Sequence, residues 1–300
     1  MLGTTGDPGG IAGEARHAER LGFDLAAAGE HVFFHGPVAS AFVTLAAAAA
    51  VTERIRLLSA VTLLPVYPMV LAAKMAATLD LVSHGRFELG VGVGGEYPAE
   101  FAASGVTVAG RGARADEALA VLVRLLSGER VTAEGRFGSL RDLRLDPPPV
   151  QRPRLPLWVG GRKMPAMRRA GRFADVWMPY MVSPESFARS LAGARDFARQ
   201  AGRPGTSLAG VFAGGHLGPF IVSAVQALTT RAWRRLRPAS PAQASDGRPD
   251  PVPASPVGRG GLGVPQGPAH LGRAAALAPA AGPSCPDGVC FPPPVTVGIP

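Results

Sequence analysis

The sequence predicts an α/β fold of the (β/α)8 TIM-barrel type that is incomplete, with its first and last strands missing or replaced. Across residues 1–215, short apolar segments alternate with segments of helical spacing. The apolar segments lack a polar face, which is typical of parallel strands covered by helices. An open doubly wound sheet is the alternative, but no G-x-G-x-x-G stands directly between an early strand and its helix.

The helical segments are recognised by apolar residues three and four positions apart and by their end signals. Gly22 follows the first of them, as a C′ glycine does. Ser183 precedes the last as a suitable N-cap, with Pro184 at the first helical position. The predicted helices are Ile11–Leu21, Phe42–Thr52, Met69–Leu81, Arg114–Leu126, Pro165–Phe173 and Pro184–Ala201.

The strand segments are short, apolar and rich in β-branched residues. The second of them stops at Pro65, which cannot continue a sheet ladder. Thr132–Gln151 has a different texture and predicts an irregular loop or short hairpin, an insertion of the kind that lids an active site. The predicted strands are Phe23–Val32, Ile55–Leu64, Phe87–Val93, Leu157–Val159, Asp175–Met178 and Leu208–Ala213.

Composition divides the chain after residue 215. Residues 216–300 hold 16 of the 30 Pro in 85 positions and contain no Glu and no Lys. Such a Pro-rich stretch with few charged residues favours extended, unpaired chain. We therefore expect an incomplete barrel domain at 1–215 and a disordered Pro/Ala/Arg/Gly-rich tail at 216–300.

Charge and cysteine content exclude several classes of function. The net charge of +9 divides into +5 up to residue 215 and +4 beyond it, so it does not form one basic face. We expect no nucleic-acid partner, although a binding module built on Arg231–Arg237 is kept as an alternative. Two Cys exclude a disulfide scaffold and a four-Cys zinc site, and no metal site is predicted.

Targeting signals are absent from the sequence as given. Met1–Gly10 has neither a basic start nor an apolar run, so it is no signal peptide. Ser207–Leu228 is uncharged and long enough to span a bilayer, but its glycines and Pro219 argue against a spanning helix. We expect a cytoplasmic protein without a membrane partner.

In a parallel barrel the active site gathers at the carboxyl ends of the strands. A histidine and glutamates at neighbouring strand ends can exchange protons with a substrate. Glycines let a flat ligand approach the backbone, and a Gly-Gly turn before a helix offers free N–H groups to a phosphate. The strand ends carry Glu30, His31, Ser59, Ala60, Val61, Gly92, Gly94, Gly95, Glu96, Gly160, Gly161, Arg162, Pro179 and Tyr180.

Several sequence blocks occur in a characteristic order. They are Gly22-Phe23-Asp24, Gly29-Glu30-His31, Thr52–Leu57, Pro65, Pro68–Lys74, Ala77–Asp80, Gly85–Gly92, Arg111-Gly112, Asp116-Glu117-Ala118, Pro149-Val150-Gln151, Leu157–Gly161 and Ala174-Asp175. Over residues 11–215 the chain thereby resembles the luciferase-like monooxygenase family, in the branch that uses coenzyme F420 or FMN. The resemblance implies a TIM-barrel oxidoreductase that transfers hydride to or from a small organic substrate.

The resemblance also implies roles for the acids and the histidine. His31 would lie near the redox ring as the proton-handling or ring-positioning group. Glu30 stands where F420-using members often have Asp and is a cofactor-binding candidate. Glu96 falls one residue later than a family acid near the ring, because Gly95 looks inserted. His31 and Glu96 are thus the catalytic candidates, with F420 as the cofactor and FMN as the alternative.

The remaining candidates would bind the cofactor. The family has a non-proline cis peptide that bulges against the back of the ring, and by position it would join Ala60 and Val61. Gly92 and Gly94 would lie beside the ring, and Gly160-Gly161 matches a phosphate-binding turn. Family members are often dimers, so a homodimer is expected.

The resemblance fails at both ends of the sequence. Met1–Gly10 lacks the apolar strand with which family members begin, and the family pattern stops after Gly215. A shifted reading frame in GC-rich DNA is one hypothesis for the second change. The alternative function is therefore a non-catalytic, truncated or frameshifted remnant of such an enzyme.

Overall fold

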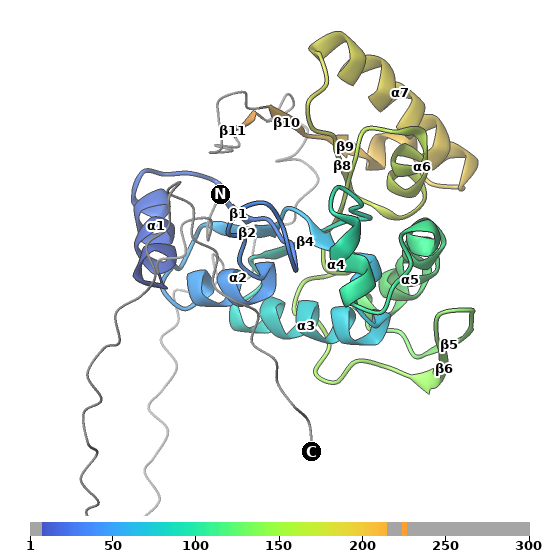
Figure 1. Cartoon of the computed structure of the whole chain (residues 1–300), viewed down its shortest axis with the longest axis horizontal. Helices are drawn as coiled ribbons and strands as arrows, with labels where there is room; N and C mark the ends of the chain where they lie inside the picture. Colours follow the sequence, from blue (N-terminus) through green and yellow to red (C-terminus); the bar gives the residue numbers. More distant parts are fainter. Residues whose placement is uncertain (1–7, 215–223, 227–300) are drawn as a thin grey trace, which may run out of the picture. The chain divides into compact units, whose positions relative to one another are not determined.

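A curved parallel sheet forms the centre of the protein (Figure 1). The computed structural model describes residues 8–214 and 224–226, all within a unit that spans Met1–Asp246. The predicted boundary after residue 215 and the predicted tail, including Arg231–Arg237, lie largely outside the described residues. The strands of the sheet are β1 (Leu25–Ala28), β2 (Arg56–Ser59), β3 (Thr62–Leu63), β4 (Phe87–Gly92), β7 (Leu157–Gly160), β8 (Val176–Met178) and β9 (Ala209–Gly210).

The strands follow one another in space in the order of the chain. The order is β1-β2-β4-β7-β8-β9, with β3 paired to β4, and every pair is parallel. A doubly wound sheet would reverse its order at a switch point, whereas a barrel does not. The predicted incomplete barrel is confirmed, and within residues 8–214 and 224–226 its edge strands are β1 and β9.

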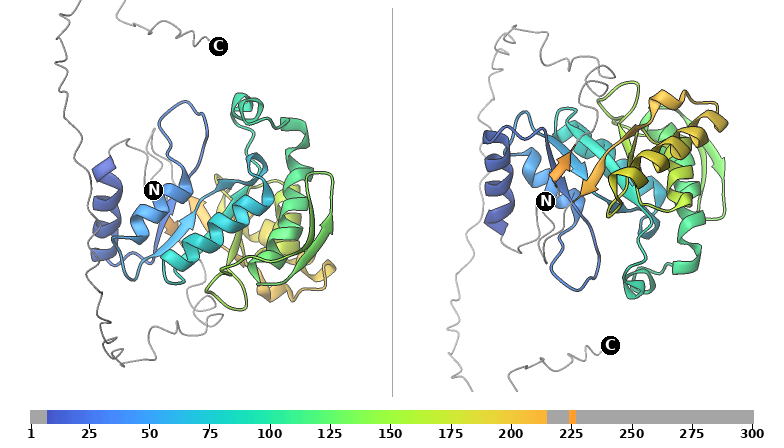
Figure 2. Two further views of the ribbon diagram at one scale, coloured as in Figure 1. Left: turned by 90° about the horizontal axis from the view of Figure 1, so that it is seen from below. Right: turned by 90° about the horizontal axis from the view of Figure 1, so that it is seen from above.

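Helices lie along the outside of the curve (Figure 2). Phe87, Leu89 and Val91 alternate along β4 and belong to the main core, which lies between the sheet and the helices. Burying each such side chain stabilises the fold by about 1.5–3 kcal/mol. The helices are α1 (Pro8–Arg20), α2 (Ala41–Ala49), α3 (Met69–Val82), α4 (Pro98–Ala103), α5 (Arg111–Leu126), α6 (Met164–Phe173) and α7 (Pro184–Gln200).

The segment predicted as one strand over Ile55–Leu64 is two strands. The peptide bond between Ala60 and Val61 is cis and lies between β2 and β3, each of which pairs with β4. Leu64 already belongs to a short 3-10 turn, Leu64–Val66. The cis bond that the family resemblance placed at Ala60–Val61 is thus confirmed.

The insertion between α5 and β7 contains a hairpin, β5 (Val131–Glu134) and β6 (Ser139–Leu143). Its tip is held by Glu117 of α5, which accepts the main-chain N–H groups of Arg136 at 2.9 Å and Phe137 at 2.8 Å. The hairpin therefore covers the helical layer. That the insertion lids the strand ends stays a prediction.

Three further differences concern short elements. Helix α4 was not predicted, because Glu96-Tyr97-Pro98 did not have the pattern of a helix start. The strand predicted over Leu208–Ala213 is broken into β9 and β10 (Phe212–Gly214). Strand β10 pairs antiparallel with β11 (Ala224–Gln226), which falls in the segment expected to lack structure.

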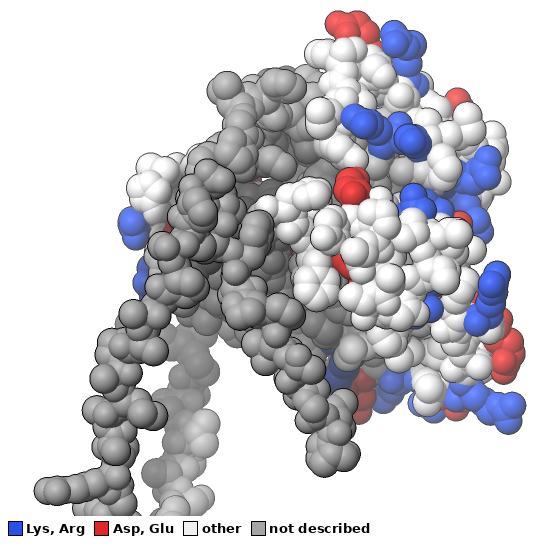
Figure 3. Space-filling model, in the orientation of Figure 1, with Lys and Arg blue, Asp and Glu red and all other residues white. Residues whose placement is uncertain are grey.

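On the face shown in Figure 3, cationic and anionic side chains are interspersed over the described surface. No helix in the part of the chain that the structure describes combines the length and apolarity needed to cross a bilayer.

Candidate functional site

A histidine–carboxylate pair lies at the carboxyl ends of the first strands. His31, just after β1, places Nδ1 at 3.1 Å from both carboxylate oxygens of Glu100. Glu100 belongs to α4, and its side chain is fully buried while that of His31 is 19% exposed. The Val32 N–H also donates to Glu100 Oε2 at 3.1 Å. One buried carboxylate therefore holds both the imidazole and the main chain beside it.

Aromatic rings continue outward from this pair. The Phe34 ring stacks on His31 with centroids 4.0 Å apart and 15° between the planes. His35 contacts Phe34 and meets the ring of Tyr97 edge-on at 5.2 Å. Phe33 and Phe34 are 54% and 41% exposed, so the loop after β1 presents an apolar surface beside the histidine.

Glu30 is buried directly behind His31. It accepts hydrogen bonds from the Tyr67 hydroxyl at 2.7 Å and from the Leu63 N–H at 3.0 Å. Burial raises the pKa of Glu30, and the hydrogen bonds from Tyr67 and Leu63 oppose the rise. Burial, together with the neighbouring Glu30, also raises the pKa of Tyr67. Glu30 thus links the end of β1 to β3 just beyond the cis bond.

The cis bond shapes the middle of the edge. Ala60 and Val61 are half-buried, and the Val61 side chain lies across two glycines of the neighbouring strands. A Cβ at Gly92 would lie 2.5 Å from Val61 Cγ2, and one at Gly160 would lie 2.9 Å from Val61 Cγ1. These glycines are needed so that the Val61 side chain can lie close against β4 and β7.

The other two predicted glycines serve turns. Gly94 has φ +56°, and its carbonyl accepts a hydrogen bond from Arg111 Nε at 3.1 Å. Gly161 has φ +118°, and its N–H donates to the Met178 carbonyl at 3.2 Å. The amide of Gly161 is therefore committed to the neighbouring strand, and the expectation that it is free for a phosphate is wrong.

Glu96 does not join the histidine. It is exposed, and Tyr180 donates its hydroxyl to Glu96 Oε1 at 3.1 Å. The Arg162 guanidinium lies 5.1 Å from the centroid of the Tyr180 ring. Burial raises the pKa of Tyr180, and the negative charge of Glu96 adds to the rise. The loops after β4, β7 and β8 thus meet in a second polar cluster.

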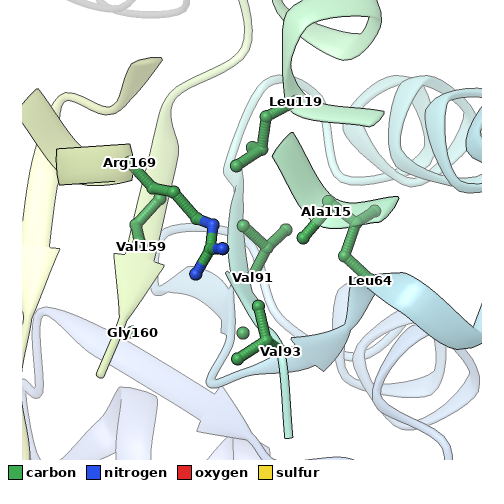
Figure 4. Close-up of a pocket in the computed structure, with 9 residues that line it drawn as sticks. Leu64, Val91, Val93, Ala115, Leu119, Val159, Gly160 and Arg169 are labelled. Atoms are coloured by element: carbon green, nitrogen blue, oxygen red, sulfur yellow. The ribbon is translucent and has the colours of Figure 1, made fainter. Parts of the chain in front are cut away.

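A small pocket opens between the carboxyl ends of β4 and β7 and the helices outside them (Figure 4). Arg169 of α6 points into it and forms an ion pair with Asp116 at 2.7 Å. The pocket is lined by Leu64, Val91, Gly92, Val93, Ala115, Leu119, Val159, Gly160 and Arg169. Its walls are mainly aliphatic, and Gly92 and Gly160 connect it to the carboxyl edge of the sheet.

The structure gathers His31, Ala60, Val61, Gly92 and Gly160 along one edge. Sequence reasoning missed Glu100, the acid that contacts His31. A usable signal was present: Pro98 suits the first position of a helix, and the segment after it is Ala-Glu-Phe-Ala-Ala, a sequence of mostly good helix formers. This edge is where barrel enzymes carry their active sites, and the fold is of that barrel class.

The family can be stated more closely. The model of the family described as luciferase-like monooxygenase matches residues 1–250. The chain therefore belongs to the luciferase-like monooxygenase family, whose members are oxidoreductases and monooxygenases.

Its curated relatives include two mycobacterial proteins. Uncharacterized proteins of Mycobacterium tuberculosis and Mycobacterium bovis are each 35% identical to the chain over 176 residues. The alignment covers 58% of this chain and 60% of each relative. The chain thus spans about 60% of the length of the relatives it matches.

Solved structures share the fold. A monooxygenase from Streptomyces bottropensis is 29% identical with a TM-score of 0.60, over 67% of this chain and 63% of its own. A coenzyme F420 dependent tetrahydromethanopterin reductase from Methanopyrus kandleri is 23% identical with a TM-score of 0.60, over 71% and 63%. A type II Baeyer-Villiger monooxygenase from Pseudomonas putida, in complex with FMN, is 22% identical with a TM-score of 0.56, over 67% and 60%.

Proposed function

We propose that the chain is an oxidoreductase that binds coenzyme F420, or alternatively FMN, at the carboxyl edge of the sheet and acts on a small organic substrate. When bound, either cofactor supplies a ring that accepts or donates a hydride. The observation that carries the proposal is the Ala60–Val61 bulge, whose Val61 side chain lies over Gly92 and Gly160, with His31 at the same edge.

The residues present fit a flat ring. The Val61 side chain occupies the space that side chains at positions 92 and 160 would take. The bulge therefore presents an apolar surface there. In the interior beneath it, Leu58, Trp158 and Met178 belong to one apolar cluster, and Trp158 also donates its indole N–H to the buried carboxylate of Glu88. Ala60 and Val61 would support the ring from behind, and Gly94 would shape the loop beside it. The exposed glutamate Glu96 would approach the substrate from the second polar cluster.

His31 would handle the proton. Its Nδ1 faces Glu100, and its Nε2 has no hydrogen-bond partner among residues 8–214 and 224–226. Nε2 is therefore the ring atom available to give or take a proton at the edge. The apolar surface of Phe33 and Phe34 next to it suits an organic substrate with an apolar part.

Cofactor binding is the first test. The purified full-length protein is titrated with F420 and with FMN and followed by fluorescence and calorimetry. We expect micromolar binding of one cofactor and at least tenfold weaker binding by Gly92→Ala, because the added methyl displaces Val61 from the strands. Gly13→Ala is the matched control, since a Cβ there meets nothing within 4 Å.

The alternative, a non-catalytic member of the family, would show itself in the same titration. Neither cofactor would bind although the protein melts cooperatively, and the proposal would then be abandoned. Equal binding by wild type and Gly92→Ala would mean that the cofactor does not bind at the bulge.

A further inference from the structure

We infer that Glu100 is the positioning residue that fixes the tautomer of His31, with the proton on Nδ1 and the lone pair on Nε2. A role in turnover rests on the proposed function, but the tautomer itself does not. Glu100 was not among the residues suggested by the sequence, and the inference comes from its contacts and burial.

The contacts define donor and acceptor. Glu100 Oε2 accepts the N–H of Val32, so this oxygen acts as an acceptor toward the main chain. Nδ1 of His31 lies at 3.1 Å from both carboxylate oxygens, the geometry of one N–H shared by the two. An ionised carboxylate can only accept, and therefore the proton between the groups belongs to Nδ1.

Burial makes the contact strong. The Glu100 side chain is 0% exposed, so water does not compete for its oxygens. A charge-assisted hydrogen bond in such a place is about twice as strong as one between neutral groups. The stacked ring of Phe34 restricts His31 from the other side. The imidazole is thus held in one orientation with Nε2 toward the open edge.

The carboxylate would also act during proton transfer. When Nε2 accepts a proton, the ring becomes an imidazolium, and the negative charge of Glu100 at Nδ1 stabilises it. A carboxylate that orients a catalytic histidine in this way contributes a large factor to turnover, since the wrong tautomer has no acceptor at the reacting position.

The ring nitrogens report the tautomer directly. The full-length protein is labelled with ¹⁵N-histidine. The signals of the two His31 ring nitrogens are assigned because they are missing from the spectrum of His31→Gln. In wild type at pH 8 we expect a protonated signature at Nδ1 and an unprotonated one at Nε2. A wild-type spectrum with the proton on Nε2 overturns the inference.

Glu100→Gln is the decisive variant. Its single carbonyl oxygen is taken by the Val32 N–H, so its NH₂ group faces Nδ1 and the proton moves to Nε2. If the enzyme turns over, kcat falls about 10²–10⁴-fold, with a smaller change in KM. Glu129→Gln, at an exposed carboxylate after α5, leaves the tautomer of His31 unchanged and is the control.

The outcomes separate the two proposals. A Gln variant that keeps the wild-type tautomer overturns this inference. Nδ1 protonation without binding of either cofactor overturns the proposed function alone. If Glu100→Gln does not melt cooperatively, the wild-type spectrum and Glu100→Asp, which retains an acceptor-only carboxylate and the Nδ1 proton, still decide the question.

Discussion

The two edges of the parallel sheet use their charged side chains differently. At the amino edge, Arg86 is 9% exposed and donates five hydrogen bonds, four of them to main-chain carbonyls. Asp80 nearby is fully buried and accepts the N–H groups of Val150 and Gln151 at 2.6 and 3.0 Å. Both of these charged side chains hold loops.

At the carboxyl edge, charged and polar side chains do more than hold loops. Glu100 holds one loop through Val32 but also faces the partly exposed imidazole of His31. Glu96 and Tyr180 lie near solvent and bind each other. The difference indicates that the amino edge provides stability, whereas the carboxyl edge carries the groups that are available for chemistry.

The largest expected effect tests the amino edge. Arg86→Ala leaves several buried carbonyls and Thr52 without a donor, so we expect the free energy of unfolding to fall by about 3–5 kcal/mol. Urea denaturation measures the loss. Arg16→Ala on the exposed face of α1 should change stability by less than about 0.5 kcal/mol. A small effect of Arg86→Ala would contradict the inference that the amino edge provides stability.

An intermediate effect concerns pH and Glu30. Because burial raises the pKa of Glu30 in the folded state, its contribution is full below the unfolded value of 4.5 and is lost as pH rises through the folded pKa. Glu30→Gln does not titrate, so its stability relative to wild type should increase as pH rises from 4.5.

Thermal melts of wild type and Glu30→Gln across pH 4 to 8 measure this difference. Cofactor titrations on the same samples show whether Glu30 acts only as a structural link between β1 and β3. A difference that is constant with pH would mean that folding does not shift the pKa of Glu30, which contradicts the prediction.

The smallest effect concerns the second polar cluster. Tyr180→Phe removes one partly exposed hydrogen bond to Glu96, so stability should fall by less than about 1 kcal/mol. Turnover, once a substrate is known, should change more than stability if this cluster belongs to the site. A fall of several kcal/mol in the free energy of unfolding would instead mean that the cluster provides stability, as the amino edge does.

The sequence predicted the barrel because its signals are local and repeated. Apolar strands such as Phe87–Val93 and end signals such as Ser183 act over a few residues, and Ser183 does accept the N–H of Ser186 at 3.2 Å. The cis bond was placed correctly by the family resemblance. Both kinds of signal can be recognised without knowledge of long-range contacts.

The site was predicted only in part. His31 and the glycines lie at the expected edge, but the acid beside His31 is Glu100, which is 69 positions away along the chain. Glu96 was the nearer acid to the glycine run, and only its orientation in the fold shows that it binds Tyr180. Likewise, the committed N–H of Gly161 depends on the neighbouring strand and not on its own turn.

Thus the amino-acid order alone determined the alternation of strand and helix, the sheet type and the glycine-rich strand ends, because periodicity and backbone freedom are properties of short segments. The pairing of an imidazole with a particular carboxylate was decided only when α4 packed beside the loop after β1. Burial there removes water as a competitor, and a hydrogen bond between distant residues then acquires its strength and direction.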